Sequence, residues 1–128
     1  MAKILLIDDE AYTRELYDEL LRDEGYEVVT ATNGEEALTE AAKGGFDLIL
    51  LDIIMPKKDG LAFLKDYDTI RPQNPNAQIV MLTVLSEDPI IKSCLEIGAS
   101  GYLIKSELTP DKLVEEVKGY LVKSSPQG

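Results

Sequence analysis

The sequence predicts an α/β fold of three layers, in which helices cover both faces of a five-stranded parallel sheet. Five short apolar runs alternate strictly with five helical patterns along the 128 residues. Each run is apolar at consecutive positions, which is typical of strands that are buried on both faces. The connections between runs and helices are short, as they are in successive β–α units of a parallel sheet.

Turn and capping residues bound these elements. Strands are expected at 3–7, 27–31, 46–51, 78–83 and 101–104. Helices are expected at about 11–24, 35–43, 60–70 and 86–97 and from 110 onward, with loops at 71–77 and 105–109. Because crossovers are right-handed, few topologies remain, and five units of this length fit the flavodoxin-like strand order 2-1-3-4-5.

Composition argues against several functional classes. The chain has 24 acidic and 13 basic residues and a net charge of −11, which argues against direct binding of nucleic acid or of an anionic membrane surface. The absence of histidine excludes histidine-based catalysis and histidine-ligated zinc. One cysteine, no signal peptide and no apolar stretch near the ~20 residues of a membrane span predict a cytoplasmic protein without membrane insertion.

Acidic side chains follow two of the predicted strands. Asp8 and Asp9 follow the first strand and Asp52 follows the third. In the order 2-1-3-4-5 these strands are neighbours, and their carboxyl ends meet at the switch point where such sheets bind ligands. Three adjacent carboxylates must take up a proton or bind a cation. Without histidine or cysteine ligands, the site favours a hard ion, Mg²⁺ (or Mn²⁺) more than Ca²⁺.

Two further polar residues are expected at the same edge of the sheet. Thr83 ends the fourth strand, and Lys105 follows the fifth. A carboxylate can attack phosphorus to form an acyl phosphate, and this transfer is catalysed mainly by positioning and by neutralising phosphoryl charge. We therefore hypothesise that Asp52 accepts a phosphoryl group beside Mg²⁺, Thr83 and Lys105.

Over residues 3–122 or so, the chain resembles the receiver domain of two-component response regulators. The residues that carry the resemblance are Asp8-Asp9-Glu10, Asp52, Met55-Pro56, Gly60, Thr83, Gly98-Ala99-Ser100-Gly101-Tyr102 and Lys105. The resemblance implies a receiver domain at 1–122, and 123–128 then form a polar tail or the start of a linker. The sequence leaves open whether the regulator is a stand-alone domain or part of a longer chain.

The resemblance also implies a role for each site residue. Asp52 is the phosphorylated aspartate. Asp9 and Asp52 bind Mg²⁺ directly together with the backbone carbonyl of Ile54, and Asp8 acts through a water molecule. Thr83, Lys105 and Tyr102 have roles after transfer: the threonine hydroxyl moves toward the phosphoryl group, the lysine is its counter-ion, and the tyrosine turns inward.

The same resemblance implies the partners of a regulator that is not itself an enzyme. A sensor histidine kinase or a phosphotransfer protein supplies the phosphoryl group. The face formed by the fourth helix, fifth strand and fifth helix contacts a downstream protein or a second copy of the chain. Ile91, Leu95 and Tyr102 are expected on this face, because the helix at 86–97 is apolar over more than one stripe. The alternative is a broad buried face.

Two residues depart from the family pattern. Ser106 stands where proline usually follows the lysine, often with a cis bond. Because a non-proline cis bond costs about 3–4 kcal/mol, a trans bond or a strained loop is expected. Val84 stands where a small residue usually follows the switch threonine, and we expect it to slow entry of the phosphodonor or hydrolysis of the acyl phosphate.

Two other functional classes fit the sequence less well. An aspartate-nucleophile phosphatase requires a second aspartate two residues after the nucleophile, and this chain has Ile54 at that position. A flavodoxin-like cofactor-binding domain wants a loop rich in Ser, Thr and Gly after the first strand. Here Asp8-Asp9-Glu10 would repel a phosphate instead.

Overall fold

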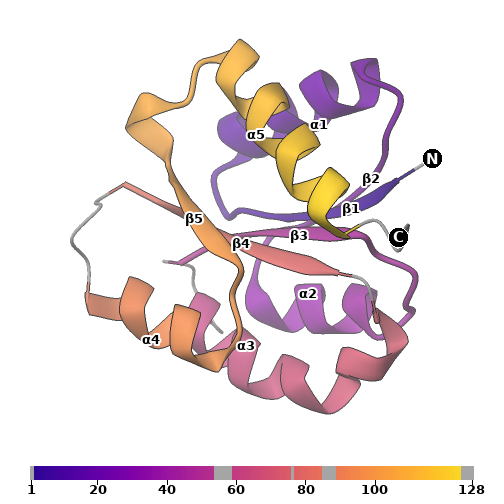
Figure 1. Ribbon diagram of the computed structural model, residues 1–128, viewed down its shortest axis with the longest axis vertical. Helices are drawn as coiled ribbons and strands as arrows, with labels where there is room; N and C mark the ends of the chain where they lie inside the picture. Colours follow the sequence, from indigo (N-terminus) through magenta and orange to yellow (C-terminus); the bar gives the residue numbers. More distant parts are fainter. Residues whose placement is uncertain (1, 54–58, 76, 85–88, 125–128) are drawn as a thin grey trace.

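The computed structural model describes residues 2–53, 59–75, 77–84 and 89–124. Its centre is one sheet of five parallel strands in the order β2-β1-β3-β4-β5 (Figure 1). The strands are β1 (Lys3–Ile7), β2 (Glu27–Ala31), β3 (Leu48–Asp52), β4 (Gln78–Thr83) and β5 (Gly101–Ile104). The predicted fold class and strand order are confirmed.

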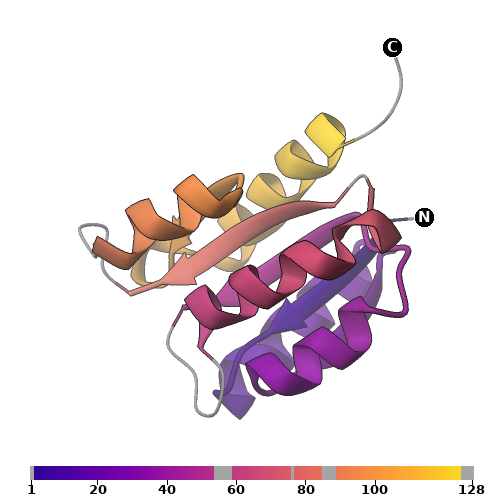
Figure 2. The same cartoon turned by 90° about the horizontal axis from the view of Figure 1, so that it is seen from below.

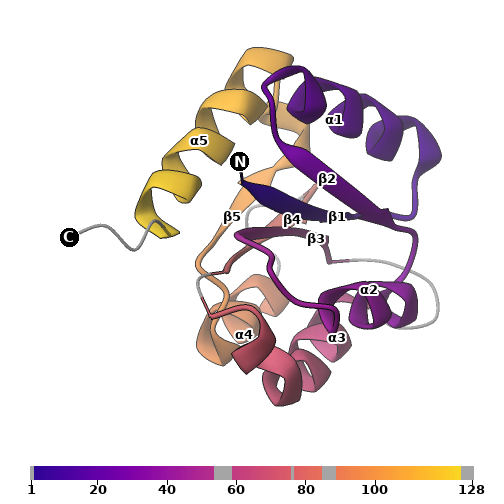
Figure 3. The same ribbon diagram turned by 90° about the vertical axis from the view of Figure 1, so that its right-hand side faces the viewer.

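Helices cover the two faces of the sheet unequally. On one face lie α1 (Ala11–Asp23) and α5 (Pro110–Ser124) (Figure 3). On the other lie α2 (Gly34–Ala41), α3 (Gly60–Tyr67) and α4 (Pro89–Ile97), the face that Figure 2 turns toward the viewer. No helix in the described ranges combines the length and the apolar composition that a membrane span requires.

Successive strand residues pack into opposite cores. In β1, Leu5 and Ile7 pack in the core beneath α2, α3 and α4, whereas Ile4 and Leu6 pack in the core beneath α1 and α5. All four are fully buried. Side chains alternate between the faces of a strand, so a run buried on both sides must be apolar at every position. Each such side chain contributes roughly 1.5–3 kcal/mol relative to an exposed one.

Several element boundaries differ from those expected. The third strand begins at Leu48 and includes Asp52, which pairs in register with Leu82 of β4. Residues 68–73, expected to be helix end and loop, form the 3₁₀ helix η1 (Asp68–Gln73), and the expected loop at 105–109 begins with η2 (Lys105–Glu107). Among the described residues α4 begins at Pro89, and the first part of the expected helix, 86–88, lies outside the described residues.

The expectation that Ile91 lies on an exposed face is wrong. Ile91 is only 5% exposed and packs with Cys94 in the core shared with α2 and α3. These residues are three positions apart, so they form the inward stripe of α4. Ile90 and Ile97 pack against the edge of the same core, and only Leu95 of the five apolar residues points outward, at 40% exposure. The alternative of a broad buried face therefore describes most of α4.

Candidate functional site

Three carboxylates meet at the carboxyl edge of the sheet, where β1 and β3 end. One carboxylate oxygen from each of Asp8, Asp9 and Asp52 lies within 4.8 Å of the others. The two strands pair in parallel from Ile4 opposite Leu48 onward, so the residues that follow them reach the same edge. Asp8 and Asp52 are buried, and Asp9 is exposed. The structure thus confirms the predicted convergence of the three aspartates.

Asp8 is bound at every polar atom. Its amide donates to the Ala31 carbonyl at 3.1 Å, and its carbonyl accepts from Arg14 Nη1 at 2.9 Å. Its Oδ1 accepts from the Glu10 amide at 2.9 Å, and its Oδ2 accepts from Lys105 Nζ at 2.8 Å. Asp8 is thus held on all sides by the protein, whereas Asp9 is exposed and lines the open side of the cluster.

Lys105 provides the positive charge of the cluster. Its Nζ lies 2.8 Å from Asp8 Oδ2 and 3.3 Å from Asp52 Oδ2. Burial lowers the pKa of Lys105, but the hydrogen bond to Asp8 and the negative charges of Asp52 and Asp8 outweigh it and hold the pKa above its usual value. Lys105 is therefore charged at neutral pH. The Lys105–Ser106 peptide bond is trans, as are the other peptide bonds of the described residues, so this departure requires no cis bond.

A cleft of about 340 Å³ opens over the cluster. Its lining residues are Asp9, Glu10, Asp52, Ile53, Thr83, Val84 and Lys105. Thr83 ends β4 and is buried, next to the end of β3 in the sheet. The cleft therefore brings together four of the predicted site residues, namely Asp9, Asp52, Thr83 and Lys105.

Other residues stand differently with respect to the cleft. Glu10 also lines the cleft, although no role is predicted for it from the sequence. Its position directly after Asp8-Asp9 is the feature of the sequence that indicates this placement. Tyr102 lies in β5 opposite Met81, is 38% exposed and lines a separate cleft of about 250 Å³ between β5 and α5. Ile54, the expected carbonyl ligand, lies outside the described residues, as do Met55 and Pro56.

Gly60 holds the end of β3 close to α3. A β-carbon at Gly60 would lie 2.9 Å from both the Asp52 carbonyl oxygen and Ile53 Cα. The Gly60 amide donates to the Ile53 carbonyl at 2.9 Å, and Asp59 caps the helix by accepting from the Ala62 amide at 2.9 Å. Only glycine allows this approach of α3 to the strand that carries Asp52.

A Gly60→Ala substitution is expected to destabilise the protein by about 1–3 kcal/mol, the usual cost of overpacking. The reason is that both of the nearest atoms belong to the backbone and cannot rotate away. The measurement is urea unfolding. Gly119→Ala in α5 is the control, because nothing lies within 4 Å of its β-carbon position and alanine favours a helix by about 1 kcal/mol. Equal stability of Gly60→Ala and the wild type would contradict the prediction.

Comparisons with known proteins agree with this geometry. The family model of the response regulator receiver domain matches residues 4–118. The chain is 40% identical over 119 residues to the probable transcriptional regulator ycf27 of Pyropia yezoensis (93% of this chain, 47% of the relative). It is 38% identical over 122 residues to the alkaline phosphatase synthesis transcriptional regulatory protein PhoP of Bacillus subtilis (95% and 49%). The chain thus spans about half the length of these relatives.

One shorter relative and one solved structure match along most of their own length. The chain is 32% identical over 122 residues to the chemotaxis protein CheY of Treponema pallidum (93% of this chain, 82% of the relative). It superposes on the chemotaxis response regulator CheY4 of Vibrio cholerae with a TM-score of 0.83 at 36% identity, covering 94% of this chain and 98% of that one. The resemblance inferred from the sequence is confirmed: the chain belongs to the family of response regulator receiver domains, the phosphorylation-dependent switches of two-component systems.

Proposed function

We propose that Asp52 is the phosphoacceptor of this switch and that a sensor histidine kinase or a phosphotransfer protein supplies the phosphoryl group. One observation carries the proposal: Asp52 is buried at the end of β3, yet it lines an open cleft and faces a charged lysine at 3.3 Å. A carboxylate in that position is held by the core and reached from solvent.

The transfer is a substitution at phosphorus. A carboxylate oxygen of Asp52 forms the new O–P bond while the bond from phosphorus to the donor breaks, and that electron pair leaves with the donor. Lys105, which lies next to Asp52, neutralises negative charge on the phosphoryl oxygens. Thr83 lines the same cleft and can donate its hydroxyl to a phosphoryl oxygen. In this scheme the chain acts on itself and is a regulator more than an enzyme.

The donor set fits Mg²⁺ (or Mn²⁺). The three carboxylates offer only oxygen, within 4.8 Å, which suits a hard divalent ion. We assign direct contacts to Asp9 and Asp52 and a water-mediated contact to Asp8, whose oxygens are already bound by Lys105 and the Glu10 amide. The carbonyl of Ile54 is proposed as a further ligand. When bound, the ion supplies neutralisation of phosphoryl charge.

Mass spectrometry after treatment with a small phosphodonor and Mg²⁺ tests the phosphoacceptor. The wild type is expected to gain about 80 Da, the mass of one phosphoryl group. Asp52→Asn is expected to stay unmodified. Asp47→Asn is the control, because Asp47 precedes the same strand at its other end and accepts a bond from the Lys3 amide that asparagine can also accept. An unmodified wild type, or an equal gain in Asp52→Asn, would rule out the assignment.

Val84 is expected to prolong the phosphorylated state. It lines the cleft beside Thr83 and is 56% exposed, so its branched side chain narrows the approach of water to an acyl phosphate on Asp52. Val84→Ala should lose phosphate several-fold faster, as followed by the decay of the modified mass. Val122→Ala, exposed on α5, is the control and should match the wild type. Equal decay in all three proteins would remove this role from Val84.

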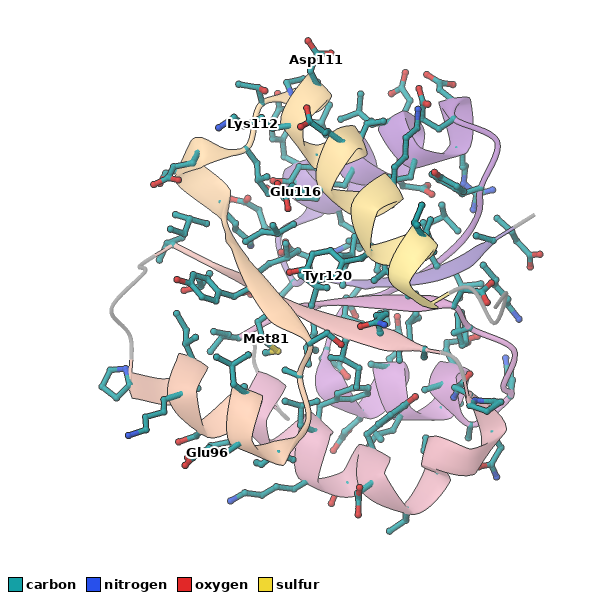
Figure 4. All side chains as sticks on the ribbon, in the orientation of Figure 1. Met81, Glu96, Asp111, Lys112, Glu116 and Tyr120 are labelled. Carbon is teal, nitrogen blue, oxygen red and sulfur yellow. The ribbon has the colours of Figure 1, made fainter. Side chains whose placement is uncertain are left out.

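We propose that movement of the Thr83 hydroxyl toward the phosphoryl group is passed on to partner proteins through Tyr102. Tyr102 and Leu95 are partly exposed on β5 and α4, and a downstream protein or a second copy of the chain would contact them there. Figure 4 shows Lys112 and Glu116 on the α5 side of this face, where both line the cleft beside Tyr102. Within this scheme residues 1–122 form the receiver domain and 123–128 a tail or linker.

A further inference from the structure

A single peptide group joins two of the three clustered carboxylates. It links Asp8, which points into the protein, to Asp9, which points toward the cleft. The orientation of this peptide plane therefore decides where the Asp9 carboxylate lies relative to Asp52. Asp8 itself is fixed on both sides of its α-carbon by hydrogen bonds, its amide to the Ala31 carbonyl and its side chain to Lys105.

The oxygen of that peptide group is held by Arg14. Arg14 Nη1 donates to the Asp8 carbonyl at 2.9 Å in a partly buried position. Arg14 lies in the first turn of α1, where its own amide donates to the Glu10 carbonyl at 3.0 Å. Long helical side chains point back toward the helix N-terminus, which brings this guanidinium to the end of β1. A shielded carbonyl needs a donor, and here the donor is a side chain and not a neighbouring strand.

We propose that Arg14 is a positioning residue for the metal site: by holding the Asp8–Asp9 peptide group, it places the Asp9 carboxylate to bind a divalent cation together with Asp52. This inference rests on the proposed function, because it takes Asp9 and Asp52 as ligands. Partners that orient metal ligands typically change metal affinity by about 10–100-fold when they are removed.

The charge of Arg14 alone would have the opposite effect. A guanidinium near the cluster repels a divalent cation, so its removal would tighten binding if charge were its only influence. Loss of positioning weakens binding instead. The sign of the change in Mg²⁺ affinity therefore separates the two roles.

The same helix offers a matched control. Arg22 donates from Nη2 to the Val28 carbonyl at 2.5 Å and pairs with Asp18 at 2.6 Å. Val28 is the second residue of β2 and lies toward the edge of the sheet opposite the acidic cluster. Replacing Arg22 removes one charge and one bond to a backbone carbonyl, as replacing Arg14 does, together with the surface pair to Asp18, but leaves the Asp8–Asp9 peptide untouched.

The experiment is a calorimetric titration of the metal-free full chain with MgCl₂. Arg14→Met keeps the apolar length of the side chain and removes the donor, and its Kd for Mg²⁺ is expected to be about tenfold weaker than that of the wild type. Arg14→Lys restores a donor and is expected to bind with an intermediate Kd. Arg22→Met is expected to match the wild type in Kd even where it lowers the melting temperature.

The possible outcomes distinguish the inference from its premise. A Kd for Arg14→Met equal to or tighter than that of the wild type overturns the positioning role, and so does an equal weakening in Arg22→Met. A wild type that binds no Mg²⁺ overturns the proposed metal site itself. If Arg14→Met does not fold, Arg14→Lys decides the matter: a Kd weaker than wild type supports positioning by the guanidinium, and an unchanged Kd contradicts it.

Discussion

An Asp9→Asn variant is expected to be more stable than the wild type without metal and to lose its stabilisation by Mg²⁺. Asp9 lies within 4.8 Å of two other carboxylates, so neutralising it relieves repulsion between like charges. Because Asp9 is exposed, the gain is about 1 kcal/mol, the value for charges near 4 Å in a water-like dielectric. The charge of Asp9 thus lowers the stability of the metal-free protein but allows the site to bind the metal.

The response to Mg²⁺ should change far more. At an ion concentration of about 100 times its Kd, the wild type gains about 2.7 kcal/mol in free energy of unfolding, and the variant should gain almost none. Urea unfolding with and without MgCl₂ measures both effects. Glu19→Gln, which neutralises another exposed acid of the neighbouring helix, controls for net charge and should keep the full response. An Asp9→Asn variant that Mg²⁺ stabilises as much as the wild type would show that Asp9 is no ligand.

A Lys105→Met variant is expected to lose about 3 kcal/mol of stability in the absence of metal, as when one partner of a buried ion pair is removed. Asp8 is 0% exposed, so its carboxylate would stay in the interior without its counter-ion. Mg²⁺ should restore part of the loss, because the ion supplies positive charge to the same carboxylates. Lys118→Met is the control: Lys118 pairs with Glu24 at 2.9 Å on the surface, where ion pairs contribute little.

The same pair predicts a dependence on alkaline pH. Because the pKa of Lys105 is raised in the fold, its contribution is complete below the ordinary value of 10.5 and is lost as the pH rises through the raised pKa. The stability difference between wild type and Lys105→Met should therefore narrow in strong alkali. Burial also raises the pKa of Tyr120, whose ionisation affects both proteins. Burial raises the pKa of Tyr17 as well, but the charge of Lys105 partly lowers it, so the ionisation of Tyr17 belongs to the difference between the two proteins. A difference that stays constant with pH would mean that the lysine charge is not involved.

The sequence predicted the sheet and its acidic edge because both depend on simple regularities. Runs such as Ile4–Ile7 and Leu48–Leu51 are apolar at every position, which is typical of strands in a parallel sheet that helices cover on both faces. Once the strand order is set, residues that end neighbouring strands must share an edge. Asp8, Asp9 and Asp52 therefore came together without any knowledge of side-chain contacts.

What the sequence did not predict depends on packing angles and on individual rotamers. The sequence of α4 contains five apolar residues and does not show which of them face α3, so it does not reveal that Ile91 packs inside. The contact of Arg14 with the Asp8 carbonyl depends on one long side chain folding back over a helix turn. In sequence, Arg14 and Arg22 are two similar charges on the same helix, and only the structure separates their partners.

The ion pair between Lys105 and Asp8 joins residues 97 positions apart, at the ends of the fifth and the first strand. A folding chain in which β1 and β3 have paired but β5 has not would hold three carboxylates together without their lysine. Docking of β5 brings in the lysine and therefore reduces the repulsion among the carboxylates that pairing of β1 with β3 brought together. In this topology, the charges at the carboxyl edge therefore favour completion of the sheet. A divalent ion bound to the three carboxylates would stabilise the partly folded chain before β5 docks.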